Sequence, residues 1–409
     1  MNKSILYIIL LFLCLKPISA QEKLGEYLET AAQNNTKLKA AFNNYMASMQ
    51  VAQQVSSLPD PQVAFAYFIQ PVETRNGPQQ FVVSASQMFP WFGTLKVKEG
   101  SSNAMAKANY ESFLAEKSKL YSDVRSIYFT LYFLNKSITI TKQNIELLNS
   151  INEMANIKIE AGTTSTVDKL SIEMMIADME NKLYLLSDEL EEQKLVFVNL
   201  LNVEKGFDIE IPEELWEDNI EYSKSQLLDS ALVNNHTINQ YNYQLESARH
   251  KINVAKKQGY PSFSIGVDYI SIGKGEMNMS GNDALIFPKV GITIPLYRKK
   301  YKSMVKEAVY VEASKDNQLQ NQNNVVANLI EKGYKNYIDS HRKIELYKRQ
   351  KELSYTSIKI LETEYMSGTK TFEELLNMER KYLNYSLQLE KARSDKQAAV
   401  AFLNSVIGK

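Results

Sequence analysis

Cysteine is almost absent from this sequence. The 409 residues contain one cysteine, Cys14, which lies inside an apolar run near the N-terminus. After that run no disulfide can form, and no thiol can act as a nucleophile or metal ligand. The sequence therefore excludes a disulfide-stabilised scaffold and a cysteine-dependent enzyme.

The chain also lacks an excess of charge of either sign. Lys and Arg together number 47, as do Asp and Glu, so the formal net charge is zero. Because binding to phosphates requires many basic residues, we expect no nucleic-acid partner. The histidines His236, His250 and His341 lack the spacing of a zinc site, and no phosphate-binding or nucleophile motif occurs. We therefore predict a protein that is not an enzyme and has no cofactor or metal site.

Long apolar runs are confined to the N-terminus. Lys3, the apolar segment Ile5–Leu15 and the segment Ile18–Ala20 follow the order of a secretory signal peptide. The run is too short for a transmembrane helix, and no later stretch approaches the roughly 18 apolar residues that such a helix needs. We predict a signal peptide over residues 1–20 and an exported chain beginning near Gln21.

Proline is missing from two long stretches, and glycine is scarce in the first of them. No proline occurs between Pro90 and Pro212 or after Pro295, and Gly162 is the only glycine in residues 102–205. Because these residue types are the strongest helix breakers, their absence predicts long helices folded back at a glycine. Roughly sixty helical residues at 1.5 Å each would reach about 90 Å.

Apolar residues in these stretches recur at alternating spacings of three and four. This heptad pattern predicts helices that pack side by side in a left-handed supercoil. The pattern includes Leu120, Val124, Ile127, Leu131, Leu134, Ile138, Ile145 and Leu148, then Ile172, Ile176, Met179, Leu183, Leu186, Leu190 and Phe197, and finally Leu375, Met378, Tyr382, Tyr385, Leu389, Ala392, Ala399 and Leu403.

The two halves of the chain repeat each other. Gly162-Thr163 recurs as Gly368-Thr369, 206 residues later. A repeat of this length far exceeds solenoid periods, so it predicts two similar structural units. We predict a first repeat over residues 21–202 with a β-hairpin at 62–89 and a helical tip near 162–168, an equatorial linker over 203–227, and a second repeat over 228–409 with a β-hairpin at 262–295 and a helical tip near 368–374.

Strict alternation of apolar with small or polar residues predicts the strands of each β-hairpin. It is seen in Val63, Phe65, Tyr67 and Ile69, in Phe81, Val83 and Ala85, in Phe263, Ile265, Val267 and Tyr269, and in Val290, Ile292 and Ile294. We expect loops at Gln70–Gln80 and Ser271–Asp283. The pattern suits transmembrane β-strands, but a soluble hairpin packed on a helix would show it too. If the strands lie in lipid, four cannot close a barrel and several chains must share one.

At this point the chain resembles the TolC family of outer-membrane efflux proteins. The most specific similarity is the paired turn, residues 159–168 and 365–375, which contains Gly162 and Gly368. Leu58-Pro59-Asp60-Pro61 and residues 87–93 are similar to the heavy-metal branch of the CusC and CzcC type. The resemblance implies an α+β fold, a long coiled-coil α-helical barrel plus a transmembrane β-barrel assembled from four strands per chain in a homotrimer. It also implies a periplasmic adaptor (membrane fusion) protein and an inner-membrane pump of the RND type.

The resemblance places a periplasmic gate at the helical tips. It implies that Asp168 faces Tyr365 and Lys370 to hold the aperture shut, with Glu374 and Asn377 in an acidic ring. Asn377 stands where a second aspartate is common, and Val167 where a hydroxyl residue occurs, so the ring and latch depart from the family pattern. The turn residues implied to contact the adaptor are Gly162, Thr163, Gly368 and Thr369.

The predicted function is therefore that of a passive exit duct in a tripartite efflux system. The duct would lie in the outer membrane of a Gram-negative cell with its helices in the periplasm. Alternatives are a type I protein secretion duct and a periplasmic coiled-coil scaffold without a pore. The 14 methionines, Met277 and Met279 among them, leave open a metal path, although methionine is also ordinary core filling.

Overall fold

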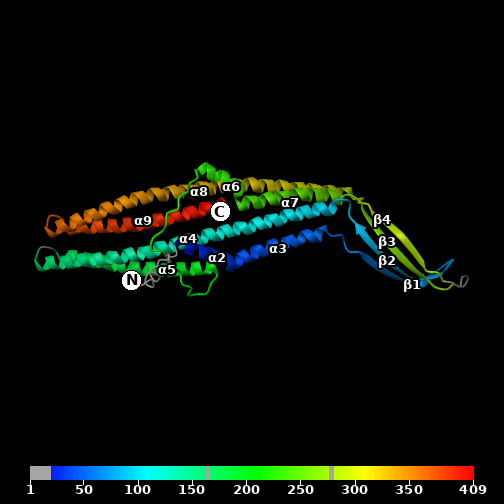
Figure 1. The fold of residues 1–409 in the computed structure, drawn as a ribbon, viewed down its shortest axis with the longest axis horizontal. Coiled ribbons are helices and arrows are strands. Elements are labelled where there is room, and N and C mark those ends of the chain that lie inside the picture. Colours follow the sequence, from blue (N-terminus) through cyan, green and yellow to red (C-terminus); the bar gives the residue numbers. More distant parts are fainter. Residues whose placement is uncertain (1–19, 163–164, 276–280) are drawn as a thin grey trace, which may run out of the picture. The chain divides into compact units, whose positions relative to one another are not determined.

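The computed structural model describes residues 20–162, 165–275 and 281–409 (Figure 1). The predicted signal peptide (apart from Ala20), Thr163 and the loop methionines Met277 and Met279 lie outside these ranges. The helices are α2 (Ala20–Asn34), α3 (Thr36–Ser56), α4 (Thr94–Glu160), α5 (Thr166–Leu201), α6 (Lys224–Asn234), α7 (His236–Gln258), α8 (Arg298–Met366) and α9 (Phe372–Val406). The strands are β1 (Gln62–Thr74), β2 (Gly77–Phe89), β3 (Ser262–Ile272) and β4 (Ala284–Thr293).

Two helices are far longer than an average protein helix. Helix α4 has 67 residues and α8 has 69, so each reaches about 100 Å. These are the stretches in which proline is missing. None of the helices in the described part of the chain is both long and apolar enough to cross a membrane.

Contacts divide the chain into two compact units. One contains the described part of Met1–Ala40 together with Leu114–Asn235 and Asn324–Lys409, and the other contains Ala41–Phe113 and His236–Asn323. Each unit therefore draws segments from both predicted repeats, and helices α4 and α8 pass from one unit into the other. The repeat boundaries describe similarity along the sequence and stay a prediction.

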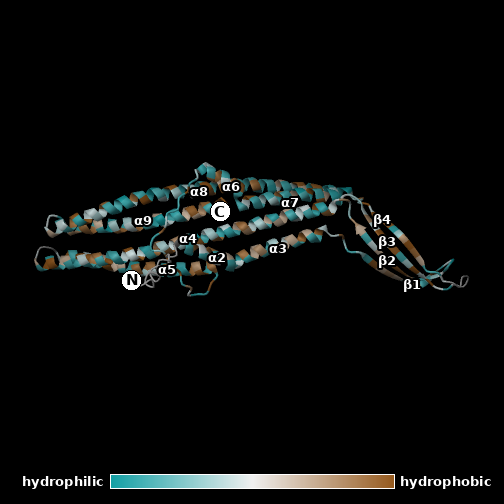
Figure 2. Cartoon of the chain, in the orientation of Figure 1, coloured by the Kyte–Doolittle hydropathy of each residue, from teal (hydrophilic) through white to brown (hydrophobic). Residues whose placement is uncertain are grey.

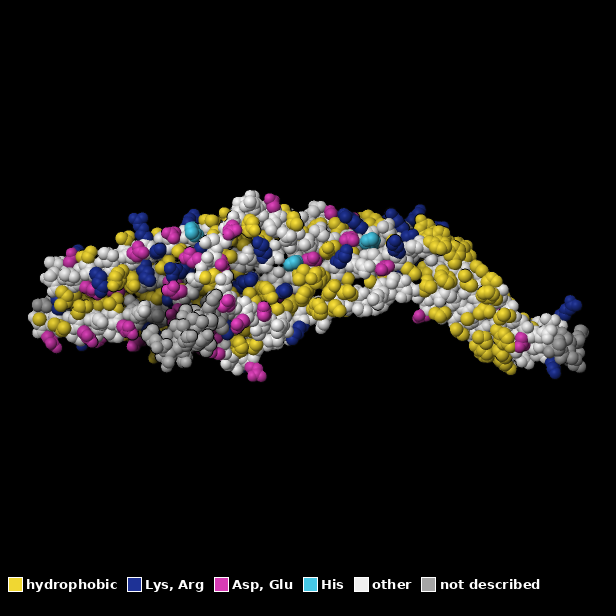
Figure 3. Space-filling view, viewed as in Figure 1, with side chains coloured by type: hydrophobic (Ala, Val, Ile, Leu, Met, Phe, Trp, Pro, Cys, Tyr) yellow, Lys and Arg dark blue, Asp and Glu magenta, His cyan; other side chains and the backbone are white. Residues whose placement is uncertain are grey.

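The unit of Ala41–Phe113 and His236–Asn323 contains an antiparallel sheet in the order β1-β2-β3-β4. Its β1 side chains are largely exposed, with Ile69 at 92%. Figure 2 colours the four strands by hydropathy, and Figure 3 shows hydrophobic side chains gathered over them on the face in view. The sheet therefore carries an exposed apolar surface of the kind that an ordinary soluble sheet buries.

The loop predicted at Gln70–Gln80 is wrong. Strand β1 continues to Thr74 and β2 begins at Gly77, so only two residues connect them. The predicted loop was the polar segment between two alternating runs, and it contains Pro71, which cannot donate a backbone hydrogen bond. However, β1 lies at the end of the strand order, where proline is tolerated, and the register shifts between Tyr67 and Val72.

The other unit contains the two helical hairpins, α4 with α5 and α8 with α9. Buried residues from all four helices form one cluster near the turns: Leu148, Ile151, Ala155, Ile172, Met175, Ile358, Tyr365, Phe372, Leu375 and Leu376. Three of the predicted heptad residues, Leu148, Ile172 and Leu375, belong to this core. We call this set the tip cluster.

The predicted linker is fastened to these helices through its backbone. Its irregular part covers residues 203–223, because α6 begins at Lys224. Lys136 donates from Nζ to the carbonyl oxygen of Glu213 at 3.0 Å, and Gln397 donates from Nε2 to that of Trp216 at 3.1 Å. The segment is therefore held against α4 and α9 of its own unit.

Candidate functional site: the tips of the two helical hairpins

Glycine in the left-handed conformation ends both long helices. Gly162 follows α4 with φ +69°, and Gly368 follows α8 with φ +79°. A residue with a Cβ adopts this conformation at a cost, which confirms the prediction that these glycines end the helices. Ser165 then begins α5 as its N-cap and accepts a hydrogen bond from the Val167 N–H at 3.2 Å.

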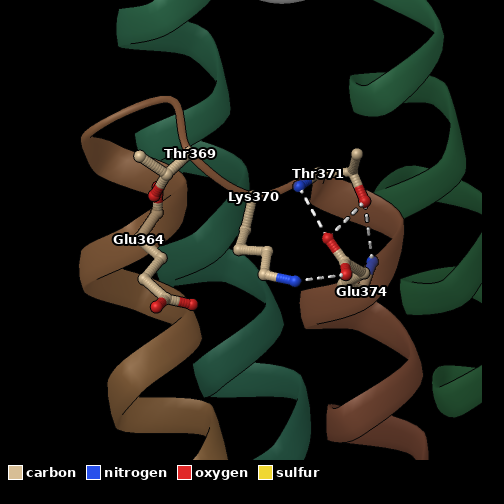
Figure 4. A network of polar contacts seen from close by, with 5 residues as sticks. All are labelled: Glu364, Thr369, Lys370, Thr371 and Glu374. Atoms are coloured by element: carbon tan, nitrogen blue, oxygen red, sulfur yellow. Dashed lines mark hydrogen bonds and ion pairs between the residues drawn. The ribbon is translucent and has the colours of Figure 1, made fainter.

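The second tip carries a complete capping box. Thr371 is the N-cap of α9, and its Oγ1 accepts from the Glu374 N–H at 3.4 Å. The Glu374 carboxylate in turn accepts from the Thr371 N–H at 3.0 Å and from Lys370 Nζ at 3.0 Å (Figure 4). The Thr369 hydroxyl donates to the Glu364 carbonyl oxygen at 3.0 Å and closes the turn. The spacing Thr371-x-x-Glu374 in the sequence is that of a capping box, and the structure shows both of its bonds.

These bonds stabilise the charged form of Glu374. The backbone N–H of Thr371, then Lys370 and the Thr371 hydroxyl, lower the pKa of Glu374 from 4.5 to about 2. Because the folded value lies below the ordinary one, the cap's contribution is fully present above pH 4.5 and is lost as the pH falls toward 2.

We expect hydrogen exchange of residues 366–374 to speed up, after correction for intrinsic rates, when the pH falls from 5.5 to 3. In Glu374→Gln the turn should exchange faster at both pH values and change little between them. The matched control is Glu373→Gln, because Glu373 is exposed and adjacent, and it should behave like the unaltered protein. Equal pH dependence in Glu374→Gln and the unaltered protein would contradict the assignment.

The predicted gate residues occupy different environments. Lys370, Glu374 and Asn377 are exposed, whereas Asp168 is half-buried in the first turn of α5. Tyr365 is only 3% exposed, and its ring packs 5.3 Å from the ring of Phe372. Within one chain Lys370 pairs with Glu374, so the structure brings these two predicted residues together.

Lys158 is a tip residue that our sequence analysis did not identify. Its Nζ lies 4.1 Å from the centre of the Tyr365 ring and donates to the Tyr365 carbonyl oxygen, and the residue is 9% exposed. A cation is favourable there because the helix dipole places negative charge at the C-terminal end of α8. Lys158 therefore joins α4 of one hairpin to α8 of the other.

The sequence did contain a signal for Lys158. Buried residues of α4 recur at Leu148, Ile151 and Ala155, and the same alternation of three and four leads to Lys158. A lysine at a core position of a heptad needs a partner within the core. Continuing the pattern past its last apolar residue would have identified it.

The structure describes no metal centre at the tips. Among residues 20–162, 165–275 and 281–409, no group of three or more His, Cys, Asp or Glu is placed to hold a metal ion. Of the methionines near the tip, Met175 belongs to the tip cluster and Met174 is exposed. The described contacts of Met175 are those of a packing residue.

Comparison with protein families adds a sequence match in the second half. Residues 227–409 match the sequence model of the family described as Outer membrane efflux protein. "Toxin and drug export protein A" of Aggregatibacter actinomycetemcomitans is 24% identical over 214 residues, which cover 51% of this chain and 46% of that protein. The matched part thus spans about half the length of that curated relative.

Solved structures match over nearly the whole chain. The outer membrane protein VceC of Vibrio cholerae gives a TM-score of 0.79 at 16% identity, covering 94% of this chain and 96% of its own. The outer-membrane channel OprN gives 0.75 at 16% identity (94% and 90%), and CusC gives 0.74 at 15% (94% and 92%). At such identities the likeness concerns the fold, and it confirms the predicted fold class.

Proposed function

We propose that this chain, whose residues 227–409 match the outer membrane efflux protein family, is the outer-membrane exit duct of a tripartite efflux system. The observation that carries the proposal is the exposed apolar sheet, joined in one chain to two long helical hairpins. An apolar exterior suits lipid, and long helices suit a wall around a lumen. We place the sheet in the outer membrane and the helices in the periplasm.

The strand order supports an assembly of several chains. Strands β1 and β4 stand at the two ends of the order, and an open sheet edge is not tolerated in lipid. Three chains would contribute twelve strands and let each β1 pair with a neighbour's β4. We therefore propose a homotrimer that works with a periplasmic adaptor and an inner-membrane pump of the RND type. The adaptor would contact the turns that contain Gly162, Thr163, Gly368 and Thr369.

In the proposed duct, substrates pass by diffusion and no residue carries out chemistry. The hairpin tips would form the periplasmic aperture, with Glu374 and Asn377 on its inner face. Because Lys370 already pairs with Glu374 in its own chain, we propose that closing moves Lys370 to Asp168 of a neighbouring chain. Tyr365 would assist from its buried place beside Lys158.

Conductance in planar bilayers tests both the duct and its latch. Replacing Asp168 and Lys370 together by alanine should raise the conductance several-fold, because three latches around one aperture are lost. The control is Lys391→Ala with Asp395→Ala, which removes a half-buried lysine–carboxylate pair of α9, 3.0 Å apart, far along the helix from the tips. It should leave the conductance unchanged.

Two results would contradict these proposals. An unchanged conductance in the Asp168 and Lys370 double variant would mean that the latch lies elsewhere. A soluble periplasmic monomer, in place of a heat-modifiable trimer in the outer-membrane fraction, would refute the duct and favour a scaffold without a pore.

A second cargo class is favoured by one specific observation. The curated relative is described as a toxin and drug export protein, so protein export joins small-molecule efflux as a candidate. The likeness to CusC does not favour metal ions, since OprN and VceC match at least as well. Export assays with a reporter toxin and with a drug, in cells expressing this chain, would separate the two classes.

A further inference from the structure

A carboxyl group on α9 is completely buried near the tips. Glu379 of α9 has 0% exposure, and neither of its carboxyl oxygens has a hydrogen-bond partner. It occupies the core position between Leu376 and Leu383, where a heptad requires an apolar side chain. Because Glu379 is already buried within a single chain, contacts with other chains cannot expose it while the two hairpins stay packed together.

Asn144 of α4 lies at the same level. Tyr132 Oη donates to Glu390 Oε2 at 2.6 Å, which fixes how the two antiparallel helices are aligned. Asn144 lies twelve residues closer to the tip than Tyr132 along α4. Glu379 lies eleven residues closer to the tip than Glu390 along α9. Asn144 is 4% exposed, and both of its amide atoms lack a partner.

Glu379 and Asn144 thus form a buried polar site between α4 and α9, and we call the interface between these two helices the seam. The hydroxyl of Thr141, one turn from Asn144, is also buried without a partner. An ionised carboxylate in such a place would be very unfavourable, whereas the neutral acid costs far less. The side chain can ionise comfortably only if water enters between the helices.

The groups around Glu379 come from several helices. From α8 come Lys359 and Glu362, which pair with each other at 2.9 Å, and Tyr382 lies one turn along α9. On α4 the residues at this level, Thr141 and Asn144, carry no charge. On α5 the residues at this level are Lys182, half-buried, and Glu180, exposed. The charges of Lys359 and Glu362 on α8 act on the pKa of Glu379 in opposite directions, so burial has the largest effect on it.

We propose that Glu379, level with Asn144, is a proton-binding site that controls how tightly the two hairpins of one chain pack near their tips. With the proton bound, the seam between α4 and α9 stays dry and closed. When the proton leaves, water enters and the seam loosens. The proton site itself does not depend on the proposed duct, but its effect on an aperture does.

The direction of the effect follows from the same surroundings. Burial, and then the Glu362 carboxylate, raise the pKa of Glu379 to about 7, although Lys359 acts the other way. A loosened seam would return the pKa toward 4.5. The closed seam therefore binds the proton more tightly than the open one, so its advantage is full below pH 4.5 and is lost as the pH rises through about 7.

The test is hydrogen exchange of the full-length protein between pH 5 and 8, corrected for intrinsic rates. Protection of residues 137–148 and 375–386 should fall at least about tenfold over this range, the effect of one pKa unit or more. Glu379→Gln, of the same shape but without a titrating proton, should remove the pH dependence. The control Glu352→Gln, an exposed carboxylate on α8, should keep it.

A pH-independent exchange in the unaltered protein, or a pH dependence that survives in Glu379→Gln, would overturn the proposal. Glu379→Met, which has a similar size, serves as a second variant if the amide disturbs folding. Conductance separates the two proposals. If exchange responds to pH through Glu379 but no channel forms, the proton site stands and the duct fails. If a channel forms and the pH dependence of exchange does not involve Glu379, the duct stands and the proton site fails.

Discussion

Replacing Lys158 by methionine is expected to release the turn of the second hairpin from the first. Methionine keeps the length and apolar character of the side chain but removes the charge. The lost contacts are a buried cation–π contact, about 2 kcal/mol, and a charged hydrogen bond to the Tyr365 carbonyl oxygen, about 1.5 kcal/mol or more. Together they amount to about 3.5 kcal/mol, which changes an equilibrium constant by roughly a hundredfold or more.

Hydrogen exchange of residues 366–371 should therefore speed up by roughly a hundredfold in Lys158→Met. Lys158→Arg should restore most of the protection, because a guanidinium also stacks on an aromatic ring. The matched control is Lys117→Met, which removes a cation 5.3 Å from the Tyr121 ring on the same helix and should leave the turn unchanged. Unaltered exchange in Lys158→Met would show that the tip cluster alone holds the hairpins together.

Replacing Gly77 by alanine is expected to prevent formation of the sheet. Gly77 has φ +120°, and a Cβ there would lie 2.0 Å from the backbone oxygen of Gly273. That oxygen cannot move away easily, because the Gly273 N–H donates to the Pro78 carbonyl oxygen at 2.8 Å. Strain and overlap together should cost more than about 3 kcal/mol.

The measurement is the amount of heat-modifiable protein in the outer-membrane fraction, which should fall at least about tenfold in Gly77→Ala, given a cost of this size. The control is Gly25→Ala on α2, where an added Cβ meets nothing within 4 Å. Alanine favours a helix over glycine by about 1 kcal/mol, so this variant should assemble as well as the unaltered protein or better. Normal assembly of Gly77→Ala would mean that the two loops separate at no great cost.

Features set by local sequence could be predicted well. The long helices follow from missing prolines, the turns from Gly162 and Gly368, and the cap from Thr371 and Glu374, because each depends on residues within one or two turns of helix. The extent of β1 past Ile69 could not be predicted, because a polar segment containing Pro71 can continue a strand only at a place in the sheet where proline is tolerated. That place is a long-range property.

The polar members of the core could not be predicted in the same way. Lys158 continues the spacing of the buried residues of α4, whereas Glu379 lies one residue away from the predicted heptad of α9, which runs through Met378 and Tyr382. In neither case does the charge reveal its partner. Lys158 contacts the ring of Tyr365 on the other hairpin, whereas Glu379 lies level with uncharged residues of α4. Only the alignment of helices across the hairpins, parallel for α4 with α8 and antiparallel for α4 with α9, distinguishes these two cases, and the sequence pattern within one helix does not contain it.

The backbone bonds that hold residues 203–223 have an evolutionary consequence. Lys136 and Gln397 bind carbonyl oxygens, which every amino acid possesses. Substitutions of Glu213 or Trp216 would leave these two bonds available, whereas substitutions of Lys136 or Gln397 would remove them. Through these two bonds, selection acts on Lys136 and Gln397 and not on the side chain of Glu213. Trp216 is constrained separately, because its ring packs 5.8 Å from the ring of Phe129.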